Sequence, residues 1–577
     1  MNLFADIEAE IRAALGALQE QGKLPDGLDM ARITVEPPRD ATHGDMATNA
    51  AMVLAKPAAM KPRDVADLLV AELLKSERIE TAEIAGPGFV NLRLDKSAWH
   101  GLLPHILSTQ EAYGDGTNGG KVNVEYVSAN PTGPMHVGHA RGAVVGDVLA
   151  RLLEKTGNEV LREYYINDAG AQVDVLAQSA LLRMREAQGE DIGAIPEGLY
   201  PGDYLVPVGA KLAAMDLPEG EAERLATAKQ VALPMMMDLI REDLGALGVS
   251  HDFFSSEQSL HDDNSVDKAL EELTDKKLIY NGVLEPPKGK EPPADWESSP
   301  QTLFKSTEFG DDSDRALKKS DGSWTYFAPD IAYHFDKYQR GYTQMIDVWG
   351  ADHIGYIKRM QSAVSAITDN QAELEVKICN LVKLMRGGEP VKMSKRSGSF
   401  ITLREVVDEV GKDAVRFMML TRKNDAPLDF DFDLVKEQSR DNPVFYVQYA
   451  HARIFSVMKN ARQLGWQVDD NTLATNHLDA LSHEAELNLI RQLGAYPRLL
   501  LAAAQAREPH RVAFYLLELA AAFHALWNLG KEEIALRFIQ EDDEAGSLAR
   551  LALIRATALT LRSGFDVIGV TPQDELR

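Results

Sequence analysis

The chain has 577 residues, of which 45% are hydrophobic and 26% charged, and its formal net charge is −27. That length predicts about four domains at roughly 150 residues each. The single cysteine, Cys379, excludes internal disulfides and a cysteine-rich zinc site, and it favours a reducing, cytoplasmic compartment. We find no apolar run of ~18 residues that would span a membrane, and the acidic, helical first segment is unlike a secretory signal.

Residues 1–112 are expected to form a small α/β domain. Helical patterns near the start and at "KPRDVADLLVAELL" are followed by two alternating segments, "IETAEIA" and "GFVNLRL", which are typical of strands. The turn-rich stretch "YGDGTNGG" (113–120) marks the end of this domain.

Residues 113–400 are expected to form a Rossmann-type domain built on a parallel sheet. The β-branched run "KVNVEYVS" predicts a strand, a helix follows and ends near Gly157, and "EVLREYYIND" predicts the next strand. Strand, helix and strand within about 45 residues indicate a βαβ unit. Residues 175–320 have the mixed pattern of insertions into this core, whereas 401–440 predict a helical connector and 441–577 a helical domain.

The loop and helix at 130–146, "NPTGPMHVGHARGAVVG", combine two histidines with three regularly spaced glycines. Each glycine inside a helix costs about 1 kcal/mol relative to alanine, so we expect a compensating close approach by another group. His136 and His139 would lie at the positive end of a helix, where imidazoles can donate hydrogen bonds to phosphate. Alternative interpretations are a metal site, which lacks the glutamate of an H-E-x-x-H motif, or histidines that merely cap the helix.

A second motif, "EPVKMSKRSGSF" (389–400), gathers cationic residues in a loop. Lys392 and Lys395 are suited to stabilising the charge that develops on a polyphosphate. By itself such a loop is more often a solvated turn. Together with the histidine motif, it is similar to the HIGH and KMSKS motifs of class I aminoacyl-tRNA synthetases, read here as His136–His139 and Lys392–Lys395 with Arg396 in place of the last serine.

Several longer segments resemble arginyl-tRNA synthetases of the bacterial type. They include "VEYVSANPTGPMHVGHARGAVVGD", "REYYINDAGAQ", "WGADHIGYIKRM" and "DNPVFYVQYAHARI", and the likeness extends over almost the whole chain. The resemblance implies that the N-terminal domain contacts tRNA and that the helical C-terminal domain reads the anticodon. It also implies the ATP-dependent attachment of L-arginine to tRNA(Arg) through an arginyl-adenylate.

The resemblance carries site residues onto matching positions of this sequence. The expected catalytic residues are His136, His139, Lys392 and Lys395. The expected ATP contacts are His136, Gly138, His139, Asp352, Lys392, Met393, Ser394 and Lys395. The expected arginine contacts are Glu125, Ser128, Asn130, His139, Tyr326 and Asp330. No resident metal is expected, Mg²⁺ accompanies ATP, and zinc plays no part.

Some alternatives stay open at this level. Asp330 follows a proline at the start of a predicted helix, so it could be an N-cap instead of a ligand for the guanidinium. Some relatives contact arginine through a glutamine near the segment that here reads "WGADH". This chain has no glutamine there, so that contact stays open, and His353 is only a candidate for it. Arg416 belongs to a locally basic stretch that suits RNA, and Tyr496 and Trp527 are candidate stacking partners.

Two other functions fit part of the pattern. A nucleotidyltransferase that activates a small acid without RNA would not need the long helical region or the extra N-terminal domain. A non-catalytic RNA-binding relative would have lost signature residues, whereas both histidines and both lysines are present. We expect a monomer with no membrane association.

Overall fold

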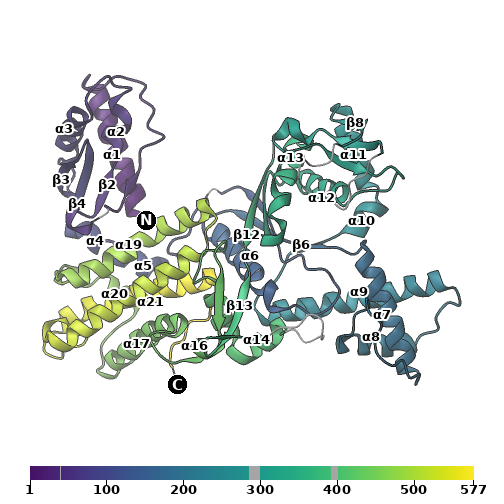
Figure 1. The fold of residues 1–577 in the computed structure, drawn as a ribbon. Helices are drawn as coiled ribbons and strands as arrows, with labels where there is room; N and C mark the ends of the chain where they lie inside the picture. Colours follow the sequence, from purple (N-terminus) through teal and green to yellow (C-terminus); the bar gives the residue numbers. More distant parts are fainter. Residues whose placement is uncertain (39, 118, 285–298, 392–400, 577) are drawn as a thin grey trace. The chain divides into compact units, whose positions relative to one another are not determined.

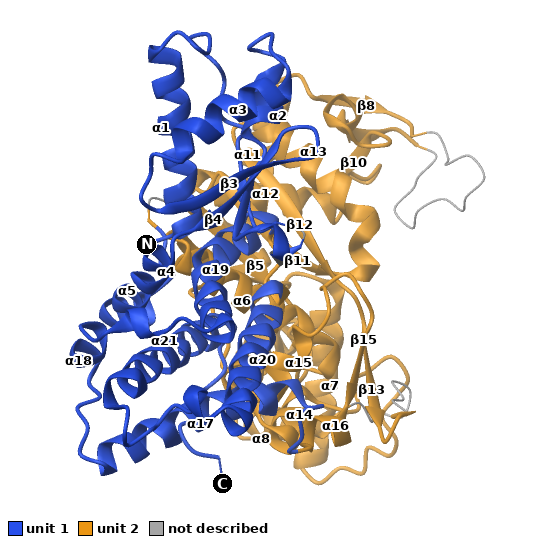
Figure 2. Cartoon of the chain, turned by 90° about the vertical axis from the view of Figure 1, so that its left-hand side faces the viewer, with its two compact units in different colours: residues 1–116, 438–506, 511–577 blue, residues 117–437, 507–510 orange. Residues whose placement is uncertain are grey.

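The computed structural model describes residues 1–576 apart from 39, 118, 285–298 and 392–400. The described residues form two compact units. One unit contains 1–116, 438–506 and 511–577, and the other contains 117–437 and 507–510 (Figure 2). The chain therefore leaves the first unit, builds the second, and returns.

The N-terminal part of the first unit is the expected small α/β fold. Its four strands form an antiparallel sheet in the order β1-β2-β4-β3. Leu3, Ile7, Ile11 and Leu15 recur at helical spacing and are buried along one face of the first helix. The elements are α1 (Leu3–Glu20), β1 (Val35–Glu36), β2 (Met46–Thr48), α2 (Ala50–Ala55), α3 (Pro62–Leu73), β3 (Ile79–Ala85), β4 (Phe89–Leu94), α4 (Lys96–His100) and α5 (Leu102–Thr109).

The C-terminal part of the first unit is helical, as its sequence pattern predicts. Long apolar helices pack on one another, with Leu489, Leu493 and Phe565 fully buried among them. The elements are α17 (Pro443–Gln463), α18 (Asp470–Ala474), α19 (Glu484–Ala506), α20 (His510–Glu532) and α21 (Glu544–Ile568).

The second unit is organised around a five-stranded sheet in the order β12-β11-β5-β6-β7. Two of these strands, β12 and β6, are labelled in Figure 1. Every neighbouring pair in it is parallel, which confirms the predicted βαβ unit and the Rossmann-type parallel-sheet fold class. The sheet elements and the helix between the first two strands are β5 (Lys121–Tyr126), α6 (Val137–Lys155), β6 (Glu159–Ile166), β7 (Phe253–Ser256), β11 (Gln344–Gly350) and β12 (Glu373–Cys379).

The strand order reverses at the central strand β5. The chain adds β6 and then β7 on one side of β5, and later adds β11 and β12 on the other. In open parallel sheets, ligands bind in the crevice outside the carboxyl ends of the strands at such a reversal. The candidate site is therefore expected just beyond β5 and β11.

The segment 175–320 differs in part from the expected pattern of insertions. Most of it is inserted structure, but β7 belongs to the main sheet, because its four residues pair with the end of β6. The remaining elements of this region are α7 (Ala171–Ala187), α8 (Val206–Ala213), α9 (Glu221–Ala246), α10 (Glu257–Asp262), α11 (Ser265–Asp275), β8 (Ile279–Gly282), β9 (Gln301–Phe304) and β10 (Arg315–Lys318).

The interval 401–440 is not wholly helical, in contrast to the prediction. It contains β15 (Leu428–Asp431), which pairs in parallel with β13 (Val382–Arg386). A strand of four residues is too short for its alternation to stand out, and its partner lies some forty residues earlier in the chain. The other elements here are β14 (Glu389–Pro390), α14 (Leu403–Val410), α15 (Lys412–Met419) and α16 (Phe432–Lys436).

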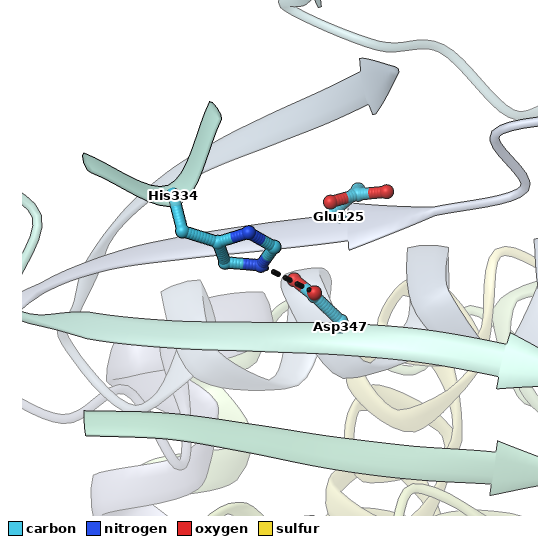
Figure 3. Close-up of side chains that lie close together, drawn as sticks. All are labelled: Glu125, His334 and Asp347. Carbon is cyan, nitrogen blue, oxygen red and sulfur yellow. Dashed lines mark hydrogen bonds and ion pairs between the residues drawn. The ribbon is translucent and has the colours of Figure 1, made fainter. Parts of the chain in front are cut away.

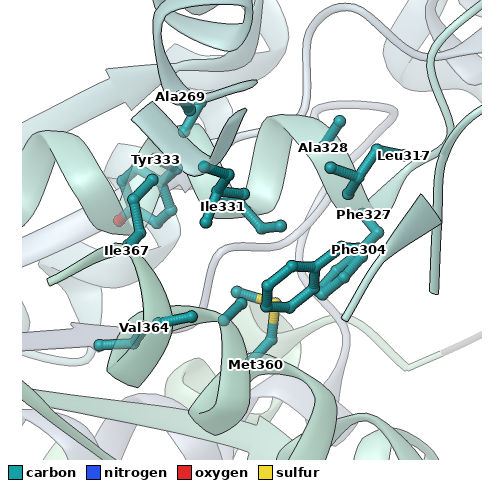
Figure 4. Packing of buried hydrophobic residues seen from close by; sticks show 14 of the residues in the cluster. Ala269, Phe304, Leu317, Phe327, Ala328, Ile331, Tyr333, Met360, Val364 and Ile367 are labelled. Atoms are coloured by element: carbon teal, nitrogen blue, oxygen red, sulfur yellow. The ribbon is translucent and has the colours of Figure 1, made fainter. Parts of the chain in front are cut away.

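A hydrophobic core holds α12 (Phe327–Gln339) and α13 (Ile357–Ile367) beside the sheet. Phe327 and Ile331 on α12 pack with Met360 and Val364 on α13, and Phe304 contributes from β9 (Figure 4). These apolar contacts fix the start of α12, which carries Asp330, relative to the end of β11.

Candidate active site

The loop that leaves β5 has an unusual backbone. Val127 and Ser128 have φ angles of 72° and 39°, in the left-handed region that non-glycine residues rarely adopt. The Ser128 Oγ donates to Glu125 Oε1 at 2.9 Å and accepts the Tyr165 N–H at 3.0 Å. The serine therefore ties the strained turn to the neighbouring strand and holds Glu125 in place.

The two signature histidines form the cap of α6. His136 is the N-cap residue, and its Nδ1 accepts the Gly138 N–H at 3.0 Å. The His139 Nδ1 lies 3.4 Å from the His136 N–H, and the two rings stack with centroids 3.9 Å apart. Because each Nδ1 accepts a hydrogen bond, a neutral ring carries its proton on Nε2. Capping is therefore one role of both histidines, and it fixes the orientation of both rings.

Two glycines of this motif allow the close approach that the sequence predicted. A methyl group on Gly146 would lie 2.2 Å from the ring of Tyr126 on β5, and one on Gly138 would lie 2.7 Å from the ring of His136. At Gly142 such a group would meet nothing within 4 Å. The weakened helix thus gains contact with its strand and with its own capping ring.

Residues that follow the second motif lie beside the start of α6. Thr402 forms an antiparallel bridge with His136, and the Leu403 N–H donates to the Met135 carbonyl at 2.8 Å. The predicted Lys392, Met393, Ser394 and Lys395 fall in 392–400, outside the described residues. The chain that continues from them is nevertheless joined to the histidine motif by backbone hydrogen bonds.

A buried charge network lies under the carboxyl end of β5. The Lys337 Nζ donates to Glu125 Oε2 at 2.7 Å and to Asp347 Oδ1 at 3.0 Å. The His334 Nε2 lies 2.9 Å from Asp347 Oδ2 (Figure 3). Burial raises the pKa of Glu125 against the attraction of the ammonium. Burial also opposes ionisation of Asp347, but Lys337 and His334 together lower its pKa to about 2.

This network has the spacing of a metal site without the chemistry of one. Ligand atoms of Glu125, His334 and Asp347 lie within 4.8 Å of one another. The Lys337 ammonium, fully buried, already bonds both carboxylates, so a metal cation would meet a like charge. We interpret the group as a structural ion network that locks α12 to β5 and β11.

Asp330 is half-buried near the start of α12, but it is not the N-cap. The cap position belongs to Tyr326, which makes no side-chain capping bond, and Asp330 lies in the first turn. The Asp330 carboxylate instead accepts a hydrogen bond from the Tyr356 hydroxyl at 2.7 Å. The capping alternative for Asp330 is therefore wrong. Burial raises the pKa of Asp330 to about 6, even though the Tyr356 bond acts to lower it.

A second carboxylate, Glu257, lies close enough to Asp330 for the two charges to interact, and it was missed at the sequence level. It is the first residue of α10, directly after β7. Burial and then the charges of Asp330 and Asp168 raise the pKa of Glu257 to about 7. Asp168 fixes the turn that carries Glu257, since it accepts the Ser256 hydroxyl at 2.7 Å and the Gln258 N–H at 2.8 Å. An acidic residue directly after a strand of the main sheet could have indicated this site. The sequence pattern did not reveal it, because residues 253–256 were assigned to an insertion and not to the main sheet.

Neither Asp330 nor Glu257 forms an ion pair within the described ranges. The charge of Asp330 therefore acts on Glu257, and both carboxylates keep raised pKa values in spite of their hydrogen bonds. Perturbed carboxylates of this kind cluster at functional sites, and they fit a cationic ligand. Glu257 follows β7 directly, and Asp330 bonds Tyr356 in the segment after β11, so both lie beyond strand ends, where the strand order predicts a ligand.

Comparison with known proteins identifies the family. The chain is 61% identical to the arginine--tRNA ligase of Parvibaculum lavamentivorans and 58% identical to that of Cereibacter sphaeroides, with all of each chain covered in both cases. The chain belongs to the arginyl-tRNA synthetase family. Three family models match parts of this synthetase: the arginyl tRNA synthetase N terminal domain at 5–94, the class I (R) catalytic domain at 102–193, and the DALR anticodon binding domain at 447–576.

The fold of the synthetase agrees with this assignment. The arginyl-tRNA synthetase of Thermus thermophilus covers all of both chains with a TM-score of 0.73, although only 22% of residues are identical. The fold class and the family predicted from the sequence are therefore confirmed.

The structure describes three further predicted contacts of the synthetase, Tyr326, Asn130 and Asp352. Tyr326 is 77% exposed. The Asn130 Nδ2 donates to Gln172 Oε1 at 2.9 Å, which ties it to the start of α7. The Asp352 carboxylate is exposed and lies 3.4 Å from the His353 ring. Their roles toward arginine and ATP stay predictions.

The helical part of the synthetase contains an aromatic surface site. The Arg453 guanidinium lies 4.1 Å from the Tyr449 ring centre and 4.8 Å from that of Trp527. Trp527 also lines a cavity of about 360 Å³. The cavity is completed by Val457, Gly530, Lys531, Leu536, Arg537, Phe538 and Ile539.

The prediction of RNA contact is wrong for two of the candidate residues. Tyr496 is fully buried, and its hydroxyl bonds Ser563 at 3.0 Å. Arg416 is also fully buried, with its guanidinium paired to Asp147 on α6. Both residues therefore stabilise the interior. Their sequence neighbourhoods are basic or aromatic, but periodicity alone did not place them on the inward face.

One helix of the described chain, α20, is long and apolar enough to cross a membrane by length and composition. This differs from the expectation that no such run exists. Half of the relevant window is buried inside the protein, where α20 is a core helix of the first unit, so the evidence for a span is weak.

Proposed function

We propose that Asp330 and Glu257 bind the guanidinium of L-arginine in the reaction of this family, the ATP-dependent attachment of arginine to tRNA in protein synthesis. Membership of the arginyl-tRNA synthetases establishes the reaction; the assignment of residues is our proposal. The observation that carries it is a pair of carboxylates beyond the strand ends, with raised pKa values and with no ion-pair partner among the described residues.

A guanidinium suits this pocket for two physical reasons. It keeps its charge at every working pH and presents planar, forked donors that match carboxylates. Bound arginine would supply a positive charge and lower both raised pKa values. Its charge would also offset part of the desolvation cost of the two carboxylates. We also assign to arginine three residues at the carboxyl end of β5 and in the loop that follows, Glu125, Ser128 and Asn130. Tyr326 is assigned to the guanidinium.

The histidine motif is assigned to ATP. The Nε2–H groups of His136 and His139, at the positive end of α6, would donate to phosphate oxygens. Gly138 keeps the backbone accessible there, and Asp352 is assigned to the nucleotide. From the sequence, Lys392, Met393, Ser394 and Lys395 complete this set, with the two lysines stabilising the leaving pyrophosphate.

The chemistry then follows in two steps. A carboxylate oxygen of arginine attacks the α-phosphate of ATP in line, which forms arginyl-adenylate and releases pyrophosphate. The 2′-hydroxyl of the terminal tRNA ribose next attacks the acyl carbon, which forms the ester and releases AMP. The protein contributes mainly positioning and charge stabilisation. Mg²⁺ enters with ATP as part of the substrate, and no zinc is involved.

The tRNA contacts are assigned to both ends of the chain. The Tyr449–Arg453–Trp527 group offers ring and guanidinium faces on which unpaired bases can stack.

We retain the domain boundaries 1–112, 113–400, 401–440 and 441–577. We also retain the proposal of a cytoplasmic monomer that does not bind membranes. These statements rest on the sequence resemblance.

The Asp330→Asn variant tests the arginine site. Breaking a buried charge pair costs about 3–5 kcal/mol, so kcat/KM for arginine should fall roughly 10²–10⁴-fold. The amide keeps the shape, so folding and the KM for ATP should change little. Asp336→Asn is the matched control, because Asp336 lies on the same helix but pairs with Arg340 at 2.8 Å. Charging by Asp330→Asn at near wild-type efficiency would refute the assignment.

A further inference from the structure

Tyr356 is the side chain that contacts the proposed guanidinium ligand Asp330. It is the last residue of the short helix η5 (Ala351–Tyr356), at the junction with α13. Its hydroxyl donates to Asp330 Oδ2 at 2.7 Å, and this is the only hydrogen bond to that carboxylate within the described chain. No feature of the sequence motifs distinguishes this tyrosine.

The ring of Tyr356 is held on several sides. It meets Phe327 edge to face at 6.0 Å between centroids and Trp349 at 6.1 Å. The Arg359 guanidinium lies 4.8 Å from the ring centre. Aromatic and cation–π contacts of this kind fix a ring more strongly than burial alone. The hydroxyl is therefore a rigidly placed donor.

The protonation states support a hydrogen bond in which Tyr356 is the donor and Asp330 the acceptor. Burial, followed by the charge of Asp330, raises the pKa of Tyr356 well above its usual value, so the phenol keeps its proton. The bond acts to lower the pKa of Asp330 against burial, and His334 acts in the same direction. The charges of Glu125 and Asp347 act in the opposite direction and raise the pKa of Asp330. Glu257 also faces this carboxylate.

We propose that Tyr356 is a positioning residue for arginine selectivity, which fixes the plane of the Asp330 carboxylate so that Oδ1 is presented to the guanidinium. This inference rests on the proposed function. A carboxylate bonded at one oxygen by an immobile donor cannot rotate freely. A planar, forked cation gains its directional bonds only if the carboxylate is coplanar with it, so the hydroxyl prepares the site before arginine arrives.

The test uses Tyr356→Phe, which removes one oxygen and keeps the ring contacts. We expect KM for arginine to rise about tenfold, equivalent to about 1.4 kcal/mol, with kcat within about twofold and KM for ATP unchanged. We also expect the acid limb of kcat/KM for arginine to move to higher pH, because Asp330 loses the bond that lowers its pKa. Tyr338→Phe is the matched control, since its hydroxyl bonds Gln371 at 2.6 Å from the same helix as Asp330.

The double variant with Asp330→Asn separates this inference from the proposed function. If Tyr356 acts through Asp330, the phenylalanine substitution should add little to the loss already caused by Asp330→Asn. An unchanged KM for arginine in Tyr356→Phe, with a large loss in Asp330→Asn, would overturn the inference and leave the function standing. Wild-type behaviour of both variants would overturn both. Parallel losses for arginine and ATP would indicate a merely structural role and overturn the inference.

Discussion

Arginine binding should weaken steeply as the pH falls from 8 to 6. On the proposed assignment, arginine binds when both carboxylates are ionised, and their pKa values without ligand are about 6 for Asp330 and about 7 for Glu257. If the two titrate independently, about nine-tenths of pockets are fully ionised at pH 8 and about one-twentieth at pH 6. Because apparent affinity scales with the competent fraction, the dissociation constant should rise about 20-fold.

The sign of this effect follows from the direction of the shifts. Both pKa values are raised by burial, so the empty pocket holds protons that arginine must displace. At pH 7, binding should release about 0.6 proton, nearly all of it from Glu257. The guanidinium itself does not titrate in this range.

Calorimetric titration with arginine at pH 6, 7 and 8 measures the affinity, and buffers with different ionisation enthalpies give the number of protons released. Glu257→Gln is the informative variant: with only Asp330 left to titrate, the change between pH 8 and 6 should shrink to about twofold. An affinity that is flat across this range in the wild type would refute the uncompensated carboxylate pair as the arginine site.

Four other substitutions have expected outcomes. His139→Ala should slow adenylate formation by roughly 10²–10³ in single-turnover assays and leave tRNA affinity unchanged, because one donor to a developing charge is lost; wild-type chemistry would contradict its role. Lys337→Met should reduce the free energy of unfolding by about 3–5 kcal/mol at neutral pH, because two buried carboxylates lose their cation. That loss should diminish in acid as the carboxylates protonate, and a loss independent of pH in chemical denaturation would contradict the network. Gly146→Ala should destabilise by about 1–3 kcal/mol through collision with Tyr126, whereas Gly142→Ala should be neutral or stabilise by up to about 1 kcal/mol in thermal melts; equal effects of the two would contradict the packing argument.

The local parts of this fold could be predicted from the sequence. Alternation and helical spacing reach only a few residues along the chain, and they correctly indicated β5, α6 and β6, the N-terminal strands and the C-terminal helices. Glycine spacing predicted a close approach along α6, which Gly146 confirms. Asp330 was assigned to the guanidinium by resemblance, and only the structure could exclude the alternative of an N-cap.

What the sequence by itself determined about this protein is its family, its parallel sheet and the position of the histidine motif at a strand end. Only the tertiary structure decided which charged groups meet. Lys337 bonds Glu125 across 212 residues, and nothing local to either residue signals that pairing. Glu257 joins Asp330 because β7 returns to the main sheet, and Arg416 is interior because Asp147 lies opposite it. Sequence patterns report which face of an element is apolar, whereas the partner of a buried charge depends on how distant elements pack, and packing is a property of the whole chain.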